Sequence, residues 1–349
     1  TGTAGLDEAL EWLEYCNYDG NTDMANLRRR NGHSRPHAVP FWGVGNETWG
    51  FWQAGHTDAA TYAEQLRQYA FFMKRIDPTI KILGVGHIDP AWNHAVLERA
   101  GHLIDYLTIH IYAHSHHLMG HDDYYPNVGA PLVFEHYLHV VSAQIKEASV
   151  RHGWSHPIYI SVDEWNLRHY TKGPDGGIEV DRHNPRTVMD ALFVAGVYHA
   201  FLRYADSVKM SNYVMMTNLN APLLVSKDSV LKTPVFDVMK LFRTVHQEQS
   251  IDCFVTSESR RARPKVDGVS PEIDVPYVDG AATQSGDGRK IVLSLINRHM
   301  SETVETNVHI VDGSVIDPKV TVHRLSGKSP LAANTFETPD AIRAKSEQT

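Results

Sequence analysis

The sequence predicts an α/β fold of repeated βα units around a parallel sheet, followed by an all-β domain. From residue 6 to about residue 246, short apolar runs alternate with longer segments of helical period. After about residue 247 the pattern changes to short alternating runs separated by Gly-rich turns. A chain of 349 residues is longer than one ordinary domain, so we expect two domains, residues 1–246 and 247–349.

Five strands are expected in the first domain. Their apolar runs lie at residues 39–45, 80–86, 105–112, 157–163 and 207–216, and each ends where polar residues begin. The segments between them carry apolar stripes of helical spacing, as in the set Tyr62, Leu66, Tyr69, Met73 and Ile76. Asp58 precedes that stripe and is expected to cap the helix. These stripes predict the helix faces that pack on the sheet.

In the second domain, strands are expected at residues 291–296, 304–311 and 320–325, which is typical of a β-sandwich. The tail at residues 338–349 turns polar, so we expect no closing strand there and an incomplete sandwich. At the other end, residues 1–5 contain neither an initiator Met nor a signal segment and lead straight into a helical pattern. We therefore expect the chain to begin inside a domain.

The composition excludes several classes of partner. The net charge is −8 and the 33 Lys and Arg residues are scattered, so we expect no nucleic-acid partner. No window reaches the roughly 18 uninterrupted apolar residues of a membrane helix. Cys16 and Cys253 match no metal or redox spacing, which favours two free thiols and a cytoplasmic location.

Two glutamates directly follow predicted strands, Glu47 after the first and Glu164 after the fourth. The carboxyl ends of barrel strands form the rim at which barrel enzymes place their chemistry. Retaining glycoside hydrolysis needs two carboxylates about 5 to 5.5 Å apart, one as proton donor and one as nucleophile. Repulsion between them raises the pKa of one partner. The alternative is that each Glu only stabilises the N-terminus of a following helix.

The motifs around both glutamates resemble those of the α-L-arabinofuranosidases of glycoside hydrolase family 51. The matching runs are Trp42-Gly43-Val44-Gly45-Asn46-Glu47, Trp52-Gln53-Ala54-Gly55-His56 and Asp163-Glu164-Trp165-Asn166. The resemblance extends over about residues 1–245, from Thr1-Gly2-Thr3 onward. It implies a (β/α)₈ TIM barrel followed by a β-sandwich, with the first three strands missing from this chain. We accordingly expect residues 1–349 expressed alone to be unstable or inactive.

The resemblance also implies an activity, the release of terminal α-L-arabinofuranosyl residues from arabinoxylan, arabinan or arabino-oligosaccharides with retention. Glu47 would be the acid/base and Glu164 the nucleophile. Asn46 would bind the sugar 2-hydroxyl, and Tyr112 would contact the nucleophile. No cofactor is implied. Family members often form homo-oligomers, but nothing in the sequence identifies an interface.

Two positions depart from the family pattern. Met215 stands where a substrate-binding Gln is usual, and Arg168 stands where many members have a second Trp. A non-catalytic sugar-binding barrel is therefore one alternative, and an endo-glucanase or β-xylosidase that uses the same two carboxylates is another.

Several aromatic and histidine side chains could also line the site. Trp52 is the preferred sugar-stacking platform, and Trp49 and Trp92 are further candidates, with core packing as the alternative for each. A histidine-rich segment contains His110, His114, His116, His117 and His121. A polar loop explains it better than a metal site does, with His110 alone lining the pocket.

Overall fold

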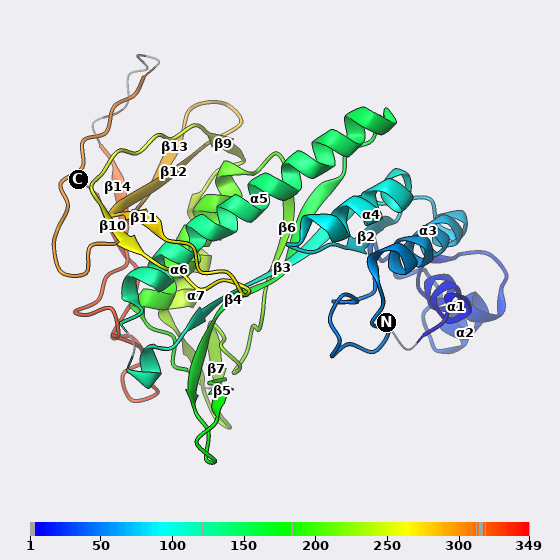
Figure 1. The fold of residues 1–349 in the computed structure, drawn as a ribbon, viewed down its shortest axis with the longest axis horizontal. Coiled ribbons are helices and arrows are strands. Elements are labelled where there is room, and N and C mark those ends of the chain that lie inside the picture. Colours follow the sequence, from blue (N-terminus) through cyan, green and yellow to red (C-terminus); the bar gives the residue numbers. More distant parts are fainter. Residues whose placement is uncertain are drawn as a thin grey trace. The chain divides into compact units, whose positions relative to one another are not determined.

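The computed structural model describes residues 4–120, 122–182, 184–311, 313, 317 and 319–348. The chain divides into two compact units, which we describe separately. Unit 1 comprises Thr1–His110, Tyr137–Asp163 and Asp206–Ser211, and unit 2 comprises Ile111–His136, Glu164–Ala205 and Asn212–Thr349. Figure 1 labels the helices and strands along the chain. The units do not follow the boundary expected after residue 246, and that boundary stays a prediction.

Unit 1 is built on parallel strands. β1 (Phe41–Val44) pairs in parallel with β2 (Lys81–Val85), and β2 pairs in parallel with the first residues of β3 (Tyr106–Ser115). β4 (Tyr159–Lys172) follows β3 in the sheet, and β6 (Val208–Tyr213) pairs with β4. All five predicted strands are confirmed within a few residues, except that β4 runs on well beyond its predicted end.

The helices of unit 1 are α1 (Leu6–Asn17), α2 (Asp23–Arg30), α3 (Ala59–Ile76) and α4 (Pro90–Ala100), followed by the short 3₁₀ helix η1 (Gly101–Leu103). The prediction for α3 is confirmed, because the Asp58 side chain accepts hydrogen bonds from the N–H groups of Ala60 and Thr61. The predicted stripe is also confirmed, since Tyr62, Leu66 and Met73 are buried. The sequence analysis did not predict α2.

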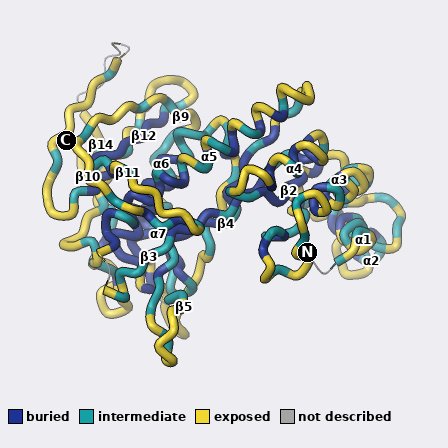
Figure 2. Tube along the Cα trace, in the orientation of Figure 1, coloured by how far each residue is buried: buried dark blue, intermediate teal, exposed yellow. Residues whose placement is uncertain are grey.

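In unit 2, α6 (Val188–Arg203) is buried along much of its length, as Figure 2 shows, and α7 (Pro234–Val245) contacts it. The other helices are α5 (Tyr124–His152), which begins in unit 2, and the 3₁₀ helix η2 (His117–Met119). The end of β4 forms a hairpin with β5 (Ile178–Val180). β7 (Leu223–Val225) and β8 (Val230–Lys232) form another hairpin.

The remaining strands of unit 2 are antiparallel and form small sheets. One sheet has the order β13-β12-β9, and the others are the pairs β10-β11 and β14-β15. The bounds are β9 (Gln249–Ile251), β10 (Ser259–Ala262), β11 (Ile273–Pro276), β12 (Val278–Gln284), β13 (Ile291–Asn297), β14 (Thr321–Arg324) and β15 (Lys345–Gln348). The strands predicted near residues 291 and 320 are therefore confirmed.

Two expectations for this region are wrong. Residues 304–310 are not a strand, and of the apolar side chains that alternate there Val308 is exposed while Val304 and Ile310 are only half-buried. The polar tail does contain a strand, since β15 pairs with β14. Both strands of this pair are largely exposed, and β15 contains no apolar residue, so the sequence of β15 carries no hydrophobic alternation. No helix in the described part of the chain is long and apolar enough to cross a membrane.

Candidate active site

Glu47 lies in a tight turn just after β1, in unit 1. Its backbone is left-handed, with a φ of +44°, and Gly45 before it has a φ of +92°. A side chain at Gly45 would be strained at that φ, and its Cβ would lie 3.0 Å from the Thr48 side chain. The N–H of Gly50 donates a hydrogen bond of 2.7 Å to the Glu47 carbonyl. The turn therefore fixes the direction in which the glutamate leaves the strand.

Three side chains of unit 1 contact the Glu47 carboxylate. The indole N–H of Trp52 and the amide N–H of Gln53 donate to Oε2, at 2.8 and 3.1 Å. His110 Nδ1, from β3, lies 2.8 Å from Oε1. The Glu47 side chain is only 13% exposed and that of His110 only 8% exposed. A carboxylate with this many dedicated contacts is not an ordinary solvated surface charge.

These contacts decide the protonation state of Glu47. Burial alone raises its pKa, but the hydrogen bonds from His110, Trp52 and Gln53 outweigh burial and lower the pKa to about 2. The expectation of a raised pKa does not hold for Glu47 in unit 1. In this arrangement Glu47 is an ionised acceptor, which is the form that a general base requires.

His110 connects Glu47 to a second acid of unit 1. Its Nε2 lies 3.4 Å from Oδ1 of Asp163, the residue before Glu164. With a proton on Nε2, facing Asp163, the lone pair of Nδ1 can accept a proton from Glu47, whereas a proton on both nitrogens stabilises the Glu47 carboxylate. His110 is therefore the neighbour through which Glu47 can gain or lose a proton.

In unit 2, Glu164 is held by Tyr112 of β3. The Tyr112 hydroxyl donates a hydrogen bond of 2.7 Å to Glu164 Oε2. Burial and the neighbouring Glu164 raise the pKa of Tyr112, so its phenol stays protonated and remains a donor. The Tyr112 backbone is fixed by Asp267, which accepts from the Tyr112 N–H at 2.7 Å and returns a hydrogen bond of 3.1 Å to the Tyr112 carbonyl.

Arg168 covers the ring of Tyr112. Its guanidinium carbon lies 3.5 Å from the ring centroid, a close cation–π contact. Trp165 and Asn166 of the same motif point elsewhere. Trp165 is fully buried among aromatic rings, and the Asn166 amide donates to the carbonyls of Val214 and Asn220. These two residues therefore support the strand that carries Glu164.

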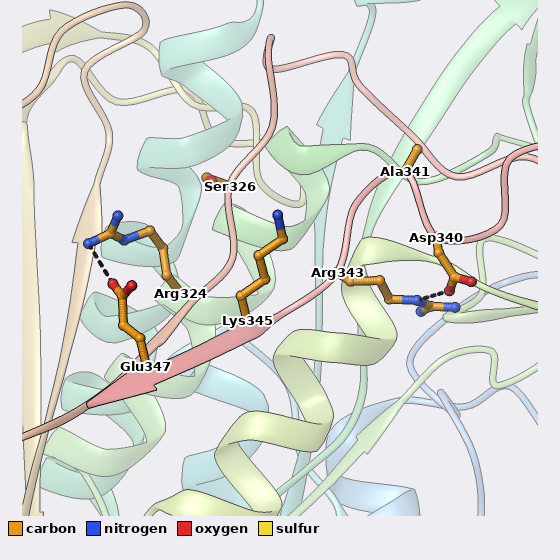
Figure 3. A pocket seen from close by; sticks show the side chains of 7 residues that line it. All are labelled: Arg324, Ser326, Asp340, Ala341, Arg343, Lys345 and Glu347. Carbon is orange, nitrogen blue, oxygen red and sulfur yellow. Dashed lines mark hydrogen bonds and ion pairs between the residues drawn. The ribbon is translucent and has the colours of Figure 1, made fainter. Parts of the chain in front are cut away.

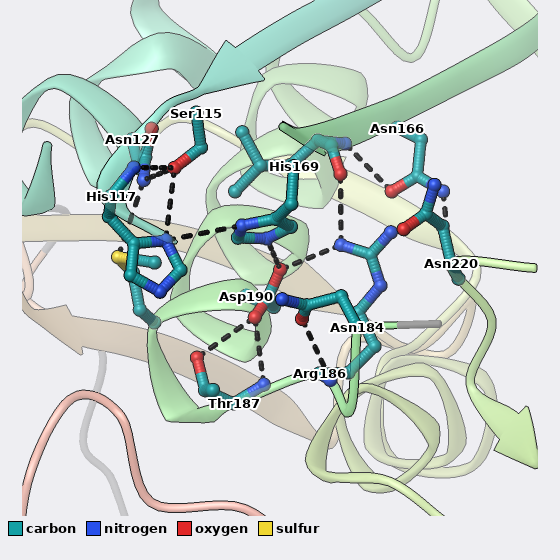
Figure 4. Close-up of polar contacts among 12 residues, drawn as sticks. Ser115, His117, Asn127, Asn166, His169, Asn184, Arg186, Thr187, Asp190 and Asn220 are labelled. Atoms are coloured by element: carbon teal, nitrogen blue, oxygen red, sulfur yellow. Dashed lines mark hydrogen bonds and ion pairs between the residues drawn. The ribbon is translucent and has the colours of Figure 1, made fainter. Parts of the chain in front are cut away.

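A buried polar network anchors β4 beyond Glu164 (Figure 4). Asp190 Oδ1 lies 2.6 Å from His169 Nε2 and accepts from Arg186 at 2.7 Å. Its other oxygen accepts from the N–H and the hydroxyl of Thr187, at 2.7 and 2.8 Å. Arg186 also donates to the Leu167 carbonyl at 2.9 Å. Because these groups are almost fully buried, the network fixes the strand next to the nucleophile candidate.

The other predicted site residues differ in their surroundings. Asn46, Trp52 and Met215 are exposed. Trp92 is only 7% exposed and donates to the Val85 carbonyl, so its candidacy as a sugar platform is wrong and it is a core residue. Trp49 is half-buried and donates to the carbonyl of Gly86 at 3.2 Å.

The histidines after His110 contact one another and Tyr170. His114 Nδ1 lies 2.9 Å from the Tyr170 hydroxyl, and the His116 ring stacks on the Tyr170 ring. His117 Nδ1 lies 3.3 Å from Nδ1 of His169. His121 and Thr1 to Thr3 lie outside the described residues.

The sequence analysis gave no role to Gln53 or Asp267. Gln53 lies inside the matched run, six residues after Glu47, so its position was the available signal. Asp267 is 155 residues from Tyr112, and no local pattern marks it.

A separate surface cavity of about 190 Å³ lies in unit 2 (Figure 3). It is lined by Arg324, Ser326, Asp340, Ala341, Arg343, Lys345 and Glu347. Arg343 pairs with Asp340 at 2.6 Å and Arg324 with Glu347 at 3.5 Å, so two of its three cations are neutralised locally. None of the predicted site residues lines it.

Two family models match the chain. The model described as α-L-arabinofuranosidase 1 domain matches residues 3–129, and the α-L-arabinofuranosidase C-terminal domain matches residues 163–349. Among curated proteins, α-L-arabinofuranosidase C of Emericella nidulans is 31% identical over 95% of this chain. The alignment covers 66% of that relative, so the chain spans just under two thirds of its length.

Another relative is the intracellular exo-α-(1→5)-L-arabinofuranosidase 1 of Bacillus subtilis, 27% identical over 88% of this chain and 62% of the relative. Solved structures agree with these matches. The α-L-arabinofuranosidase of Thermotoga maritima, in complex with arabinose, has a TM-score of 0.88 and 33% identity over all of this chain and 70% of its own. The family 51 enzyme of Thermotoga petrophila has a TM-score of 0.86 and 32% identity over the same shares. The chain therefore belongs to the α-L-arabinofuranosidases of glycoside hydrolase family 51.

Proposed function

We propose that the protein containing this chain is a retaining α-L-arabinofuranosidase with Glu47 as acid/base and Glu164 as nucleophile. The observation that carries the proposal is that each carboxylate is half-buried and has dedicated partners. Trp52, Gln53 and His110 contact Glu47, and the Tyr112 hydroxyl donates to Glu164. Family membership supports the substrate class, because the relatives are named for this activity.

In the first step, a Glu164 oxygen bonds to the anomeric carbon, the glycosidic C–O bond breaks, and Glu47 gives its proton to the leaving oxygen. In the second step, a water oxygen bonds to the same carbon, Glu47 takes the water proton, and the ester bond to Glu164 breaks. Because the hydrogen bonds to Glu47 favour its carboxylate, Glu47 is in the form that accepts the water proton in the second step. For the first step it must hold a proton, and His110 is placed to share one.

The same proposal includes the barrel architecture, the residues that line the pocket, the substrates and the cellular location. The parallel strands of unit 1 and β6 would form five of the eight strands of a (β/α)₈ barrel, followed by a β-sandwich. Asn46 would bind the sugar 2-hydroxyl, and Met215, Trp52 and His110 would line the pocket. Side chains of arabinoxylan, arabinan or arabino-oligosaccharides would be the substrates. Free Cys16 and Cys253, and the Bacillus relative named intracellular, support a cytoplasmic location.

The test is a panel of aryl glycosides assayed with the full-length protein. We expect hydrolysis of the aryl α-L-arabinofuranoside and none of the β-xyloside or β-glucoside, with the product released as the retained anomer. Glu164→Ala should abolish turnover, because no covalent intermediate can form. Hydrolysis of the β-xyloside or β-glucoside but not of the arabinofuranoside would overturn the substrate, and sugar binding without any turnover would favour a binding protein.

A further inference from the structure

Arg168 and Glu164 share one face of a strand. Both belong to β4, four residues apart, and side chains at even separations in a strand point to the same side. The Arg168 guanidinium lies on the ring of Tyr112, 3.5 Å from its centroid, and the hydroxyl of that ring donates to Glu164 at 2.7 Å. A positive charge is therefore stacked on the group that contacts the nucleophile candidate.

This positive charge is not neutralised by a carboxylate nearby. Within the described part of the chain, no ion pair involves Arg168. Asp267 accepts from the Tyr112 N–H and lies 3.7 Å from His114 Nε2. Among the other titratable neighbours, Tyr170 contacts Arg168 as well as His114 and His116. Lys265 Nζ lies 3.3 Å from His116 Nδ1. The guanidinium is thus available to act on Tyr112 and Glu164.

We propose that Arg168 is a positioning residue that stabilises the ionised form of Glu164 through Tyr112 and so sets the balance between the two displacement steps. The inference rests on the proposed function. Its physical basis is that a nearby positive charge favours a carboxylate over a neutral ester or acid. The aromatic ring fixes the guanidinium plane, and the tyrosine hydroxyl stays directed at the carboxylate.

The two displacement steps respond to the charge of Arg168 in opposite ways. When Glu164 bonds to the anomeric carbon it loses its negative charge, so a neighbouring guanidinium makes it a weaker nucleophile and slows this step. When the ester bond breaks, the electron pair returns to the carboxylate, and the same guanidinium favours its departure. Arg168 therefore speeds release of the sugar from Glu164.

The test compares Arg168→Met with Arg168→Lys in the full-length protein. Met keeps a long side chain that packs on an aromatic ring but removes the charge. Lys keeps the charge and loses the planar stacking. The readouts are the steady-state kcat and KM and the pre-steady-state burst with an aryl α-L-arabinofuranoside that has a good leaving group. Arg289→Met is the matched surface control, since the Arg289 side chain is 88% exposed.

For Arg168→Met we expect release of the sugar from Glu164 to slow about tenfold, with a larger burst. Arg168→Lys should keep the wild-type burst, and Arg289→Met should change neither readout. If Arg168→Met does not fold, Arg168→Gln removes the charge for the same measurements.

Three results would contradict these statements. A wild-type burst in Arg168→Met and Arg168→Gln would overturn the inference. Equal shifts in Arg168→Lys and Arg168→Met would also overturn it, because packing and not charge would then be the cause. A wild-type protein that hydrolyses no arabinofuranoside would instead overturn the proposed function, and the inference with it.

Discussion

Removing one hydroxyl, by Tyr112→Phe, tests the contact that holds the nucleophile candidate. The substitution keeps the buried ring and the Arg168 guanidinium above it, and it deletes only the 2.7 Å hydrogen bond to Glu164 Oε2. A hydrogen bond to a charged group contributes about 1.5 to 3 kcal/mol. Because the bond orients the attacking oxygen, a loss of this size corresponds to a fall of about 10- to 150-fold in kcat/KM.

The assay is hydrolysis of an aryl α-L-arabinofuranoside by the full-length protein, with thermal unfolding measured in parallel. Tyr124→Phe is the matched control, because it removes another buried tyrosine hydroxyl of unit 2, one that donates to the Arg298 carbonyl at 3.2 Å. We expect its kcat/KM to stay within about threefold of wild type. Full activity in Tyr112→Phe, or equal losses in both variants, would refute the reasoning.

Three further predictions concern the acid/base and the support of β4. Glu47→Ala should reduce hydrolysis of natural saccharides by about 100- to 10,000-fold. It should have far less effect on aryl substrates, whose leaving groups need little protonation. Equal losses on both kinds of substrate would contradict the acid role of Glu47. Asp190→Asn leaves the buried Arg186 without its counter-charge, so the free energy of unfolding should fall by about 3 to 5 kcal/mol in denaturant titrations. An unchanged denaturant midpoint would contradict the claim that this network stabilises the fold. The pKa of Asp190 is lowered by His169 and Arg186 despite burial, so this group stabilises the fold above the unfolded pKa of about 3.8 and loses that contribution as pH falls below it. The midpoint temperature of thermal unfolding should therefore fall steeply below pH 4 in wild type and less steeply in Asp190→Asn. Parallel curves of midpoint temperature against pH for the two proteins would contradict this.

The sequence predicted elements well where the signal is local. An apolar stripe beside an Asp cap predicts α3 because both features act within a few residues. The strand β15 could not be predicted, since its residues alternate with no apolar face and pairing with β14 alone defines it. Near Val308, in contrast, apolar and polar residues alternate as they do in a strand, but Val308 is exposed and no strand forms.

The contacts in the candidate site likewise divide into local ones, which a sequence motif contains, and long-range ones, which only the fold brings together. Trp52 and Gln53 reach Glu47 from five and six residues away, so one motif contains both the acid and its donors. His110 and Asp267 reach their partners across 63 and 155 residues, and only the folded chain brings them there. The low pKa of Glu47 likewise depends on donors whose geometry the sequence cannot supply.

The central claim is that Glu164 forms a covalent bond to the sugar. The most direct measurement is peptide mapping by mass spectrometry after the full-length protein reacts with an arabinofuranosyl inactivator that carries fluorine at C2 and traps the intermediate. We predict one added sugar on the peptide that contains Glu164, and none in Glu164→Gln. A sugar attached to a different residue, or release of inverted product with no adduct in an active protein, would contradict the account.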